Sequence, residues 1–576
     1  MTCNTCVYWQ PKEWAGWQYI DEEAYCEISK RNTTALHSCE NASITKTEVT
    51  SETLELYDHQ KEAVEFFDSK EEIALFFEMG VGKSATVLAI AANKFKRGEI
   101  DALLVVAPND VHKQWAVEQV PLWLKVPYEV QCLYGRGGQK QAYSFDDDSK
   151  LHVVCVNIDT FSTPSKWKDV VAWANSKQTF IVLDEATTIK NVNAQRTQRM
   201  LYEFNNTVRR GRTILQTERL SVARAILTGT PVTNGAMDLW AMMEFLKPNF
   251  FGRNWYSFQN YYGMFTRLAV NNREINVPLT AEWWAAIKEC TTYGKAYAIC
   301  GCTEDTYNTI QNQDEYEGPY KHAEELKELI KPVSIFKTLV DCVDMPPQIY
   351  NTRTITMNDA QQACYNSMVE EFIATYANHV ATAANKMSVM MRLQQISSGF
   401  ICDKTIEDDD TDIVPDEIVW LGKTIPKLEA LYRDVEELSK PLIIITRFTA
   451  EASRIYEDLK DKYSCCLVTG WKRVGTIDEF KEGKYQIMVA NIAAIARGHN
   501  LQISHVVCFY SNTFSLEYRL QAEGRIFRIN QQHPCEYVDY INEGTVDEKI
   551  VSALQLKRKL LDYMRSVDVE EMICKK

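Results

Sequence analysis

The chain has 576 residues, of which 45% are hydrophobic and 24% charged, so it is too long for one core and has the composition of a globular protein. Its net charge of −15 excludes a protein that coats nucleic acid over its whole surface, although a local basic groove remains compatible with it. No apolar run approaches the roughly 18 residues of a membrane span, and the start Met1-Thr2-Cys3 does not resemble a secretion signal, so we expect a cytoplasmic chain without a membrane segment.

Residues 1–45 are predicted to form a separate small module. It contains four cysteines, the first two as a C-x2-C pair: Cys3, Cys6, Cys26 and Cys39. Four thiolates can complete a tetrahedral Zn²⁺ site, and His37 could replace one of them. A metal would supply folding free energy that so short a segment lacks. The alternative is four free thiols in an unstructured terminus, since seventeen cysteines without an export signal indicate a reducing compartment.

From residue 56 the pattern alternates between apolar strands and helices, which is typical of α/β layers around a parallel sheet. The run at 73–76 predicts a buried strand and residues 85–95 a helix, with a glycine-bearing turn between them. Such a turn lets backbone N–H groups and a helix N-terminus approach the phosphates of ATP. Lys83 would reach the β- and γ-phosphates, and the Ser84 hydroxyl would hold Mg²⁺. The predicted nucleotide-binding residues of this turn are Met79, Gly80, Val81, Gly82, Lys83 and Ser84.

This turn departs from the general phosphate-loop pattern, which has a glycine where Phe77 stands. Taken alone, it could be an ordinary structural turn before a helix. Further apolar strands are predicted at 102–107, 151–158 and 180–183, and the last of them ends in Asp184 and Glu185. The carboxyl end of such a strand is where α/β sheets bind ligands.

Asp184 and Glu185 suit the hydrolytic half of a nucleotide site. Asp184 would bind Mg²⁺, and Glu185 would polarise the attacking water. The alternative is a pair of carboxylates that caps the next helix. Because the pair follows a buried strand about 100 residues after the Lys-Ser turn, the hydrolytic interpretation is favoured.

Residues 249–340 interrupt the α/β pattern and are rich in aromatic side chains within helix-like stretches. A base-stacking platform is one interpretation, but aromatic residues at helical spacing more often fill a core. A second α/β pattern follows, with strands predicted at 441–446, 464–469, 485–490 and 505–510.

After these strands, Gln521, Arg525 and Arg528 are spaced to share one helical face. Arginines brought across a cleft by a second domain stabilise charge at the γ-phosphate only when the cleft closes. The alternative is a pair of surface arginines.

Five segments together resemble Swi/Snf-type ATPases of helicase superfamily two: LYDHQ, EMGVGKS, LLVVAPNDVHKQW, LDEAT and ILTGTPVTNGAMDLWAMMEFLKP. The last is the most specific, because the agreement continues past a turn into the following helix. The resemblance covers roughly residues 54–560. It implies two RecA-like α/β domains, in the order domain 1 (54–248), a helical insertion (249–340), domain 2 (341–560, with a helical and acidic-loop insertion near 360–430) and a tail (561–576).

The resemblance also implies an activity: ATP-driven movement along duplex DNA by opening and closing of a cleft, without separation of the strands. Residues with an implied catalytic role are Lys83, Asp184, Glu185, Gln521, Arg525 and Arg528. Gln60 and Gly498 are added to the nucleotide-binding residues. The expected contacts to nucleic-acid phosphates come from Asn109, Lys113, Thr228, Gly229, Thr230 and Asn491.

Three positions depart from the usual pattern of these ATPases: Thr187, His499 and Asn530. They leave ATP hydrolysis intact but bear on its coupling to nucleic acid. Two other functions therefore stay open, namely a strand-separating DNA or RNA helicase, and an ATP-gated clamp that recruits a protein partner through the cysteine module. The compact core and the small module most resemble phage or bacterial members, so we expect a bacterial or phage-infected host cytoplasm.

Overall fold

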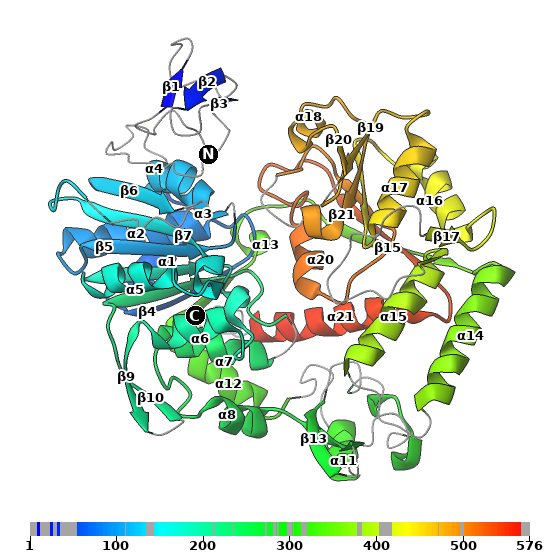
Figure 1. Ribbon diagram of the computed structural model, residues 1–576, viewed down its shortest axis with the longest axis horizontal. Helices are drawn as coiled ribbons and strands as arrows, with labels where there is room; N and C mark the ends of the chain where they lie inside the picture. The colour runs from blue at the N-terminus through cyan, green and yellow to red at the C-terminus, as the bar shows by residue number, and fades with distance from the viewer. Residues whose placement is uncertain are drawn as a thin grey trace, which may run out of the picture.

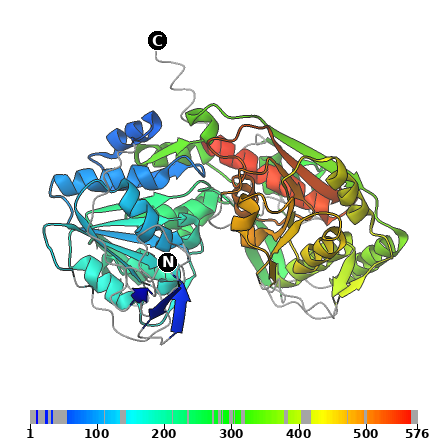
Figure 2. The same cartoon turned by 90° about the horizontal axis from the view of Figure 1, so that it is seen from above.

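The computed structural model describes most of the chain from residue 55 onward and three short strands before it. The described residues are 9–11, 23–26, 31–34, 55–109, 111–133, 143, 145–210, 213–233, 236–270, 273–279, 284, 287–295, 302, 304–312, 320–376, 383–402, 418–470, 472–495 and 500–565. They include two seven-stranded sheets, each in its own lobe (Figure 1), and the lobes lie side by side when the molecule is seen from above (Figure 2). The prediction of two parallel-sheet α/β domains is confirmed.

The first sheet consists of parallel strands only. In spatial order they are β14 (Ser334–Lys337), β4 (Glu72–Phe77), β11 (Ala223–Leu227), β8 (Thr179–Asp184), β5 (Ala102–Ala107), β7 (Leu151–Asn157) and β6 (Tyr128–Leu133). Strands buried on both faces have continuous apolar sequences. In β5, Leu103 and Val105 accordingly pack into one hydrophobic cluster, while Leu104 and Val106 pack into another.

Helices cover both faces of this sheet. The first cluster includes residues of α1 (Asp58–Phe67) and α2 (Lys83–Lys96), and the second includes residues of α5 (Trp167–Asn175), α6 (Gln195–Tyr202) and α7 (Leu239–Leu246). The carboxyl ends of β4, β8 and β11 lie at one edge of the sheet, because parallel neighbours run in the same direction. Residues that follow these three strands therefore meet in space.

The second sheet is parallel except at one edge. In spatial order it contains β15 (Gln348–Ile355), β23 (Cys535–Asn542), β22 (Val506–Phe509), β18 (Leu442–Thr446), β21 (Ile487–Asn491), β19 (Cys465–Val468) and β20 (Arg473–Val474), the last pair antiparallel. One face packs on α16 (Pro426–Glu437) and α17 (Thr449–Leu459), and the other on α18 (Ile477–Lys481), α19 (Ile492–Ile495) and α20 (Leu516–Glu523).

The segment between the domains differs from the predicted helical insertion in two ways. Its elements are α8 (Trp255–Tyr262), a hairpin of β12 (Phe265–Val270) and β13 (Arg273–Pro278), α11 (Glu304–Asn312) and α12 (Ala323–Ile330). It thus contains strands as well as helices. It also ends earlier than expected, because β14 pairs with β4 and belongs to the first sheet. Tyr262 and Trp284 are buried, which confirms that these aromatics fill a core, whereas Tyr256 is exposed.

The remaining elements are short or lie at the borders of the domains. They are α3 (Val111–Gln114), η2 (Trp115–Gln119), α4 (Val120–Trp123), η3 (Ile158–Ser162), η4 (Ala186–Ile189), β9 (Asn205–Arg210), β10 (Thr213–Arg219), η5 (Ala236–Asp238), η6 (Lys331–Val333), α13 (Leu339–Cys342), α14 (Asp359–Tyr376), α15 (Ala383–Ser397), β16 (Phe400–Cys402), β17 (Ile418–Trp420) and α21 (Val546–Arg565). Helix α21 packs against α20, and its Leu556 reaches the core of the insertion.

The N-terminal module is described only as a three-stranded antiparallel sheet, β1 (Trp9–Pro11), β2 (Glu23–Cys26) and β3 (Arg31–Thr34). Cys3, Cys6 and Cys39 lie outside the described residues, as does the side chain of Cys26, so the Zn²⁺ site stays a prediction. Within the described ranges, no group of three or more His, Cys, Asp or Glu side chains could hold a metal ion. Nor does any helix in those ranges combine the length and apolarity that a membrane span requires.

Candidate active site

The turn between β4 and α2 depends on two glycines in the left-handed region. Gly80 has φ 88° and Gly82 has φ 93°, a conformation that L side chains rarely adopt. Gly82 immediately precedes α2, and a Cβ there would lie 2.0 Å from Nε2 of Gln60. The first turn of α2, with Lys83 and Ser84, therefore follows a backbone bend that requires glycine at two positions, and the first N–H groups of a helix have no partner within the helix itself.

Helix α1 supports this turn from behind. Gln60 is buried, its Nε2 donates to the carbonyl of Val81 at 3.1 Å, and its Oε1 accepts from the Tyr57 N–H at 3.0 Å. The His59 ring lies 2.9 Å from the same carbonyl and stacks on Tyr57. In this structure the Gln60 amide therefore holds the turn, and direct contact with a nucleotide stays a prediction.

Lys83 folds back over the turn. Its Nζ donates to the carbonyls of Phe77 at 3.0 Å and Glu78 at 3.4 Å. Glu78 fixes the turn from the other side: its N–H donates to the carbonyl of Lys337 at 2.8 Å, and its Oε2 accepts from the N–H of Leu339 at 2.9 Å. The Lys83 ammonium therefore lies against the backbone of the turn in this structure.

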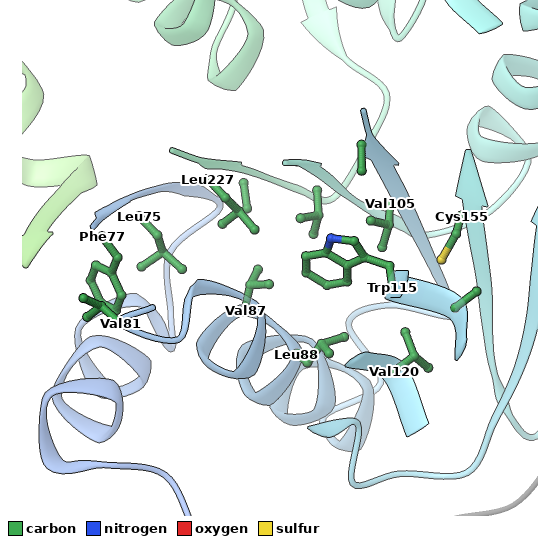
Figure 3. Close-up of a cluster of buried hydrophobic side chains, with 14 of the residues drawn as sticks. Leu75, Phe77, Val81, Val87, Leu88, Val105, Trp115, Val120, Cys155 and Leu227 are labelled. Carbon is green, nitrogen blue, oxygen red and sulfur yellow. The ribbon is translucent and has the colours of Figure 1, made fainter. Parts of the chain in front are cut away.

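Asp184 ends β8 and is almost fully buried. Its Oδ1 accepts from the N–H of Glu185 at 3.0 Å, and its Oδ2 accepts from the indole Nε1 of Trp115 at 2.8 Å. The indole lies within the core between α2 and β5, near Val87 and Val105 (Figure 3). Burial raises the pKa of Asp184, and the Trp115 hydrogen bond and the charge of Lys83 oppose that rise.

Glu185 has a strained backbone and a half-buried side chain. Its φ of 48° is in the left-handed region, which costs a non-glycine residue about 1–3 kcal/mol and is common at functional sites. Burial raises the pKa of Glu185 to about 7; Lys83 and Arg525 oppose the rise, whereas Asp184 and Glu517 add to it. Charges from both domains therefore converge on this carboxylate.

We predict that Trp115→Phe lowers the free energy of unfolding of the first domain by about 1–3 kcal/mol, because it leaves a buried carboxylate short of one donor. Urea unfolding followed by circular dichroism measures this. Trp173→Phe is the matched control, since the buried Trp173 Nε1 makes no hydrogen bond within the described part of the chain. Equal losses for the two variants would contradict the prediction, because both remove a similar apolar volume.

The second domain contributes α20 and the turns that follow it. Gln521 lies in α20, which ends at Glu523 with Gly524 as its C-cap. Arg525 and Arg528 come after the helix, so the prediction that all three share a helical face was wrong. The backbone tightens there into i to i−3 hydrogen bonds, for example from the Arg525 N–H to the Ala522 carbonyl at 3.2 Å.

Arg525 is buried and faces the first domain. Burial and the charge of Arg528 lower the pKa of Arg525 to about 9, and the carboxylate of Glu185 opposes this shift. Arg528 Nε donates to the carbonyl of Gly524 at 2.9 Å. A Cβ on Gly524 would lie 3.5 Å from Met79 Sδ, so the phosphate-loop turn and the end of α20 are in close approach.

Helix α20 is held in place by buried charges. Arg519 Nε donates to Glu523 at 2.6 Å, and its two other nitrogens donate to Asn512 and Asp539. The second carboxylate oxygen of Glu523 accepts from Arg558 of α21 and from the hydroxyl of Tyr350. Such a network is satisfied only in one orientation, so α20 presents a defined face to the first domain.

A cleft lies between these two surfaces. Its lining includes, from the first domain, Glu78, Met79, Lys83, Glu185, Gly229 and Thr230, and from the second domain Gln521, Glu523, Gly524, Phe527 and Arg558. Of the predicted catalytic residues, Lys83, Glu185 and Gln521 thus share one cavity. Segments more than 300 residues apart in the sequence form its walls.

The residues predicted to bind nucleic acid lie in different surroundings. Thr228 and Thr230 are buried, and Gly229 packs against the phosphate-loop backbone, so this turn forms part of the cleft wall. Asn109 is exposed and accepts from Asn157 at 3.2 Å, while Lys113 is half-buried in α3.

The structure does not support a contact of Asn491 with nucleic acid or of Gly498 with the nucleotide. Asn491 is buried, donates to the Arg447 carbonyl at 2.6 Å and accepts from the Ala493 N–H at 3.0 Å. Its amide therefore serves the fold in this structure. Gly498 lies outside the described residues.

Sequence reasoning missed two side chains at this site, Trp115 and Glu517. Trp115 lies in the quoted segment LLVVAPNDVHKQW, but nothing in the segment indicates that its indole reaches Asp184. Glu517 bonds Thr187 and Lys190 of the first domain. Thr187 departs from the usual family pattern, and this departure was the sequence feature that pointed to a contact of its own at this position.

Comparisons with known proteins agree on one family. The SNF2-related domain matches residues 59–399, and the helicase conserved C-terminal domain matches residues 426–530. An uncharacterized ATP-dependent helicase, MG018, of Mycoplasma genitalium is 21% identical over 540 residues, covering 89% of this chain and 43% of that protein. The human SWI/SNF-related matrix-associated actin-dependent regulator of chromatin subfamily A containing DEAD/H box 1 is 21% identical over 512 residues, covering 85% and 47%. The chain thus spans less than half the length of these relatives.

Among solved structures, a Sulfolobus solfataricus SWI2/SNF2 ATPase core in complex with dsDNA has 19% sequence identity and a TM-score of 0.36. That comparison covers 92% of this chain and 97% of the other.

Proposed function

The chain belongs to the family of the SNF2-related domain, and on this basis we propose that it hydrolyses ATP between its two domains and uses the hydrolysis to move along duplex DNA. The observation that carries the proposal is the shared cleft, in which Lys83 and Glu185 of the first domain face Gln521 of the second. A site divided between two domains can couple a chemical step to their relative movement.

The residues of the turn suit a triphosphate with Mg²⁺. Ser84 at the start of α2 and the buried carboxylate of Asp184 provide the oxygen ligands that Mg²⁺ prefers. When bound, the ion would neutralise phosphate charge. The ammonium of Lys83, now held by two backbone carbonyls, would turn to phosphate oxygens.

The remaining charged groups act on the reacting end of the nucleotide in this proposal. Glu185 would orient the attacking water and accept its proton, since its carboxylate lies in the cleft beside Lys83. Arg525, and with it Arg528, would stabilise negative charge that develops at the γ-phosphate. Because burial removes Arg525 from water, its charge acts more strongly on a nearby anion than an exposed one.

Movement along DNA would follow from the arrangement of the two sheets. Asn109 is exposed just beyond the carboxyl end of β5 in the first domain, whereas Asn491, which ends β21 in the second, is buried and holds the start of the segment that follows it. We propose that each domain contacts the phosphates of one duplex, through Asn109 and Lys113 in the first domain and through the segment after Asn491 in the second. Opening of the cleft would change the distance between these two contacts.

Steady-state ATP hydrolysis with no nucleic acid, single-stranded DNA, duplex DNA or RNA tests the proposal. We expect duplex DNA to stimulate turnover most strongly. Stimulation by single strands or RNA alone would favour a strand-separating helicase, and turnover that no nucleic acid changes would contradict movement along DNA.

A second assay separates movement from unwinding. A translocase displaces a third strand bound to a duplex and leaves the duplex paired, whereas a helicase unwinds a forked duplex. We expect triplex displacement without fork unwinding. Tight ATP-dependent binding without turnover would instead favour a clamp.

A further inference from the structure

The two domains also meet through a carboxylate beside the cleft. Glu517, the second residue of α20, accepts a hydrogen bond from Thr187 Oγ1 at 3.1 Å and another from Lys190 Nζ at 3.3 Å. Thr187 lies in η4 and Lys190 directly follows it, so both belong to the segment after the Asp184-Glu185 pair. The contact joins residues more than 320 positions apart.

The first-domain side of this contact is itself anchored. Lys190 Nζ also donates to Thr233 Oγ1 at 3.0 Å, and the Thr233 hydroxyl donates to Asp238 Oδ2 at 2.9 Å. A chain of four polar groups therefore links α20 to two first-domain segments, η4 and the turn after β11. Anchored groups lose little further entropy when they pair, which favours the contact.

The ion pair is partly shielded from water. The side chains of Lys190 and Glu517 are 28% and 19% exposed, so screening is weaker than for a surface pair. Both also have a hydrogen bond to a neutral partner, which offsets part of the desolvation cost. The contact is therefore built to persist when the domains are together.

The same carboxylate reaches the proposed catalytic residues. Gln521 Nε2 lies 3.5 Å from Glu517 Oε1 within α20, and Arg525 follows Gln521 by four residues, just beyond the end of the helix. On the other side, Thr187 is two residues from Glu185. The Glu517 contact thus lies between Gln521 of the second domain and the Glu185 segment of the first, and it sets the distance between them.

We propose that Glu517 is a positioning residue, whose contact with Thr187 and Lys190 holds Gln521 and Arg525 in register with Glu185 when the cleft closes. This inference rests on the proposed ATP hydrolysis. Glu517 does not touch the nucleotide in this scheme. Its loss therefore lowers kcat, while KM for ATP, which depends mainly on the first-domain turn, changes little.

Glu517→Gln and Glu517→Ala test the contact in the full-length chain. The glutamine keeps an oxygen that can accept from Thr187 but loses the ion pair, and the alanine loses both. We expect kcat to fall about tenfold, within the range of coupling between contacting residues, and further in the alanine variant. Glu429→Gln, at an exposed position on α16, is the matched control and should retain wild-type kcat.

A charge exchange separates positioning from a general structural role. Glu517→Lys places two ammonium groups together and should lower kcat more than Glu517→Gln. Adding Lys190→Glu restores an opposite pair across the interface and should recover most of the lost kcat. Damage confined to α20 would not be rescued by a change in the other domain.

The outcomes are distinct. Unchanged kcat in Glu517→Gln and Glu517→Ala, or no rescue in the exchanged pair, overturns this inference while wild-type hydrolysis leaves the proposed function standing. A rise in KM without a fall in kcat also overturns it. A wild-type chain without ATPase activity overturns the proposed function and this inference together. Should Glu517→Lys fail to fold, the isosteric glutamine variant decides.

Discussion

Replacing Arg525 by alanine is expected to lower kcat for ATP hydrolysis by about a thousandfold, the lower end of the effect of arginine fingers. Arg525 approaches the first domain from across the cleft, and Glu185 is the charged group of that domain that it senses. Its side chain is buried, so in the proposed site its charge would act on the γ-phosphate with little screening by water. Single-turnover hydrolysis measures the chemical step directly.

Two comparisons define the result. Arg433→Ala removes an arginine from an exposed position on α16 and should leave kcat unchanged. Arg525→Lys keeps the charge but loses the planar fork, and we expect it to remain strongly impaired. A turnover close to wild type in Arg525→Ala would contradict the assignment of Arg525 to the transition state.

Replacing Lys83 by alanine is expected to lower kcat at least about a hundredfold, the scale of a lost preorganised donor at a developing charge. Nothing else in the first turn of α2 carries a positive charge, because the residues after Lys83 are Ser84, Ala85 and Thr86. The fold should be retained, since the Lys83 ammonium donates to two backbone carbonyls of the neighbouring turn.

Lys96→Ala is the control for Lys83→Ala, because it removes an exposed lysine from the other end of α2. Binding of a fluorescent ATP analogue should show whether Lys83→Ala also weakens affinity. Hydrolysis at the wild-type rate in Lys83→Ala would exclude the β4–α2 turn as the phosphate site.

Local apolar pattern was enough to predict most of the parallel strands. The run at 102–107 coincides with β5, and Asp184 ends β8 as expected from the carboxylates after an apolar run. Buried parallel strands are readable because both faces must be apolar, so the signal is contained within a few residues. The meeting of Lys83, Glu185 and Gln521 followed from family resemblance, not from pattern.

Structural features that depend on residues far away in the sequence could not be predicted from local sequence pattern. The strand β14 has only four residues, and its partner β4 lies some 260 residues earlier. The end of α20 at Glu523 was missed because Gln521, Arg525 and Arg528 keep helical spacing in the sequence, although the backbone after Glu523 leaves the helix in tighter turns. Side-chain pairs such as Trp115 with Asp184 cannot be predicted from hydrophobic periodicity. Periodicity indicates which face of an element is buried, but not which side chains come into contact there.

The late position of β14 has a consequence for the order in which the protein is made. Glu78, in the turn between β4 and α2, is held by Lys337 and Leu339, and Leu339 follows it by 261 residues. At a synthesis rate of about 5–20 residues per second, the loop emerges roughly 13–50 s before its fastening does. Once β11 has been made, and until β14 follows, β4 is an edge strand of an incomplete sheet. The ribosome thus makes β4 long before the segment that covers it, and a nascent chain halted before residue 334 has no β14 at that edge.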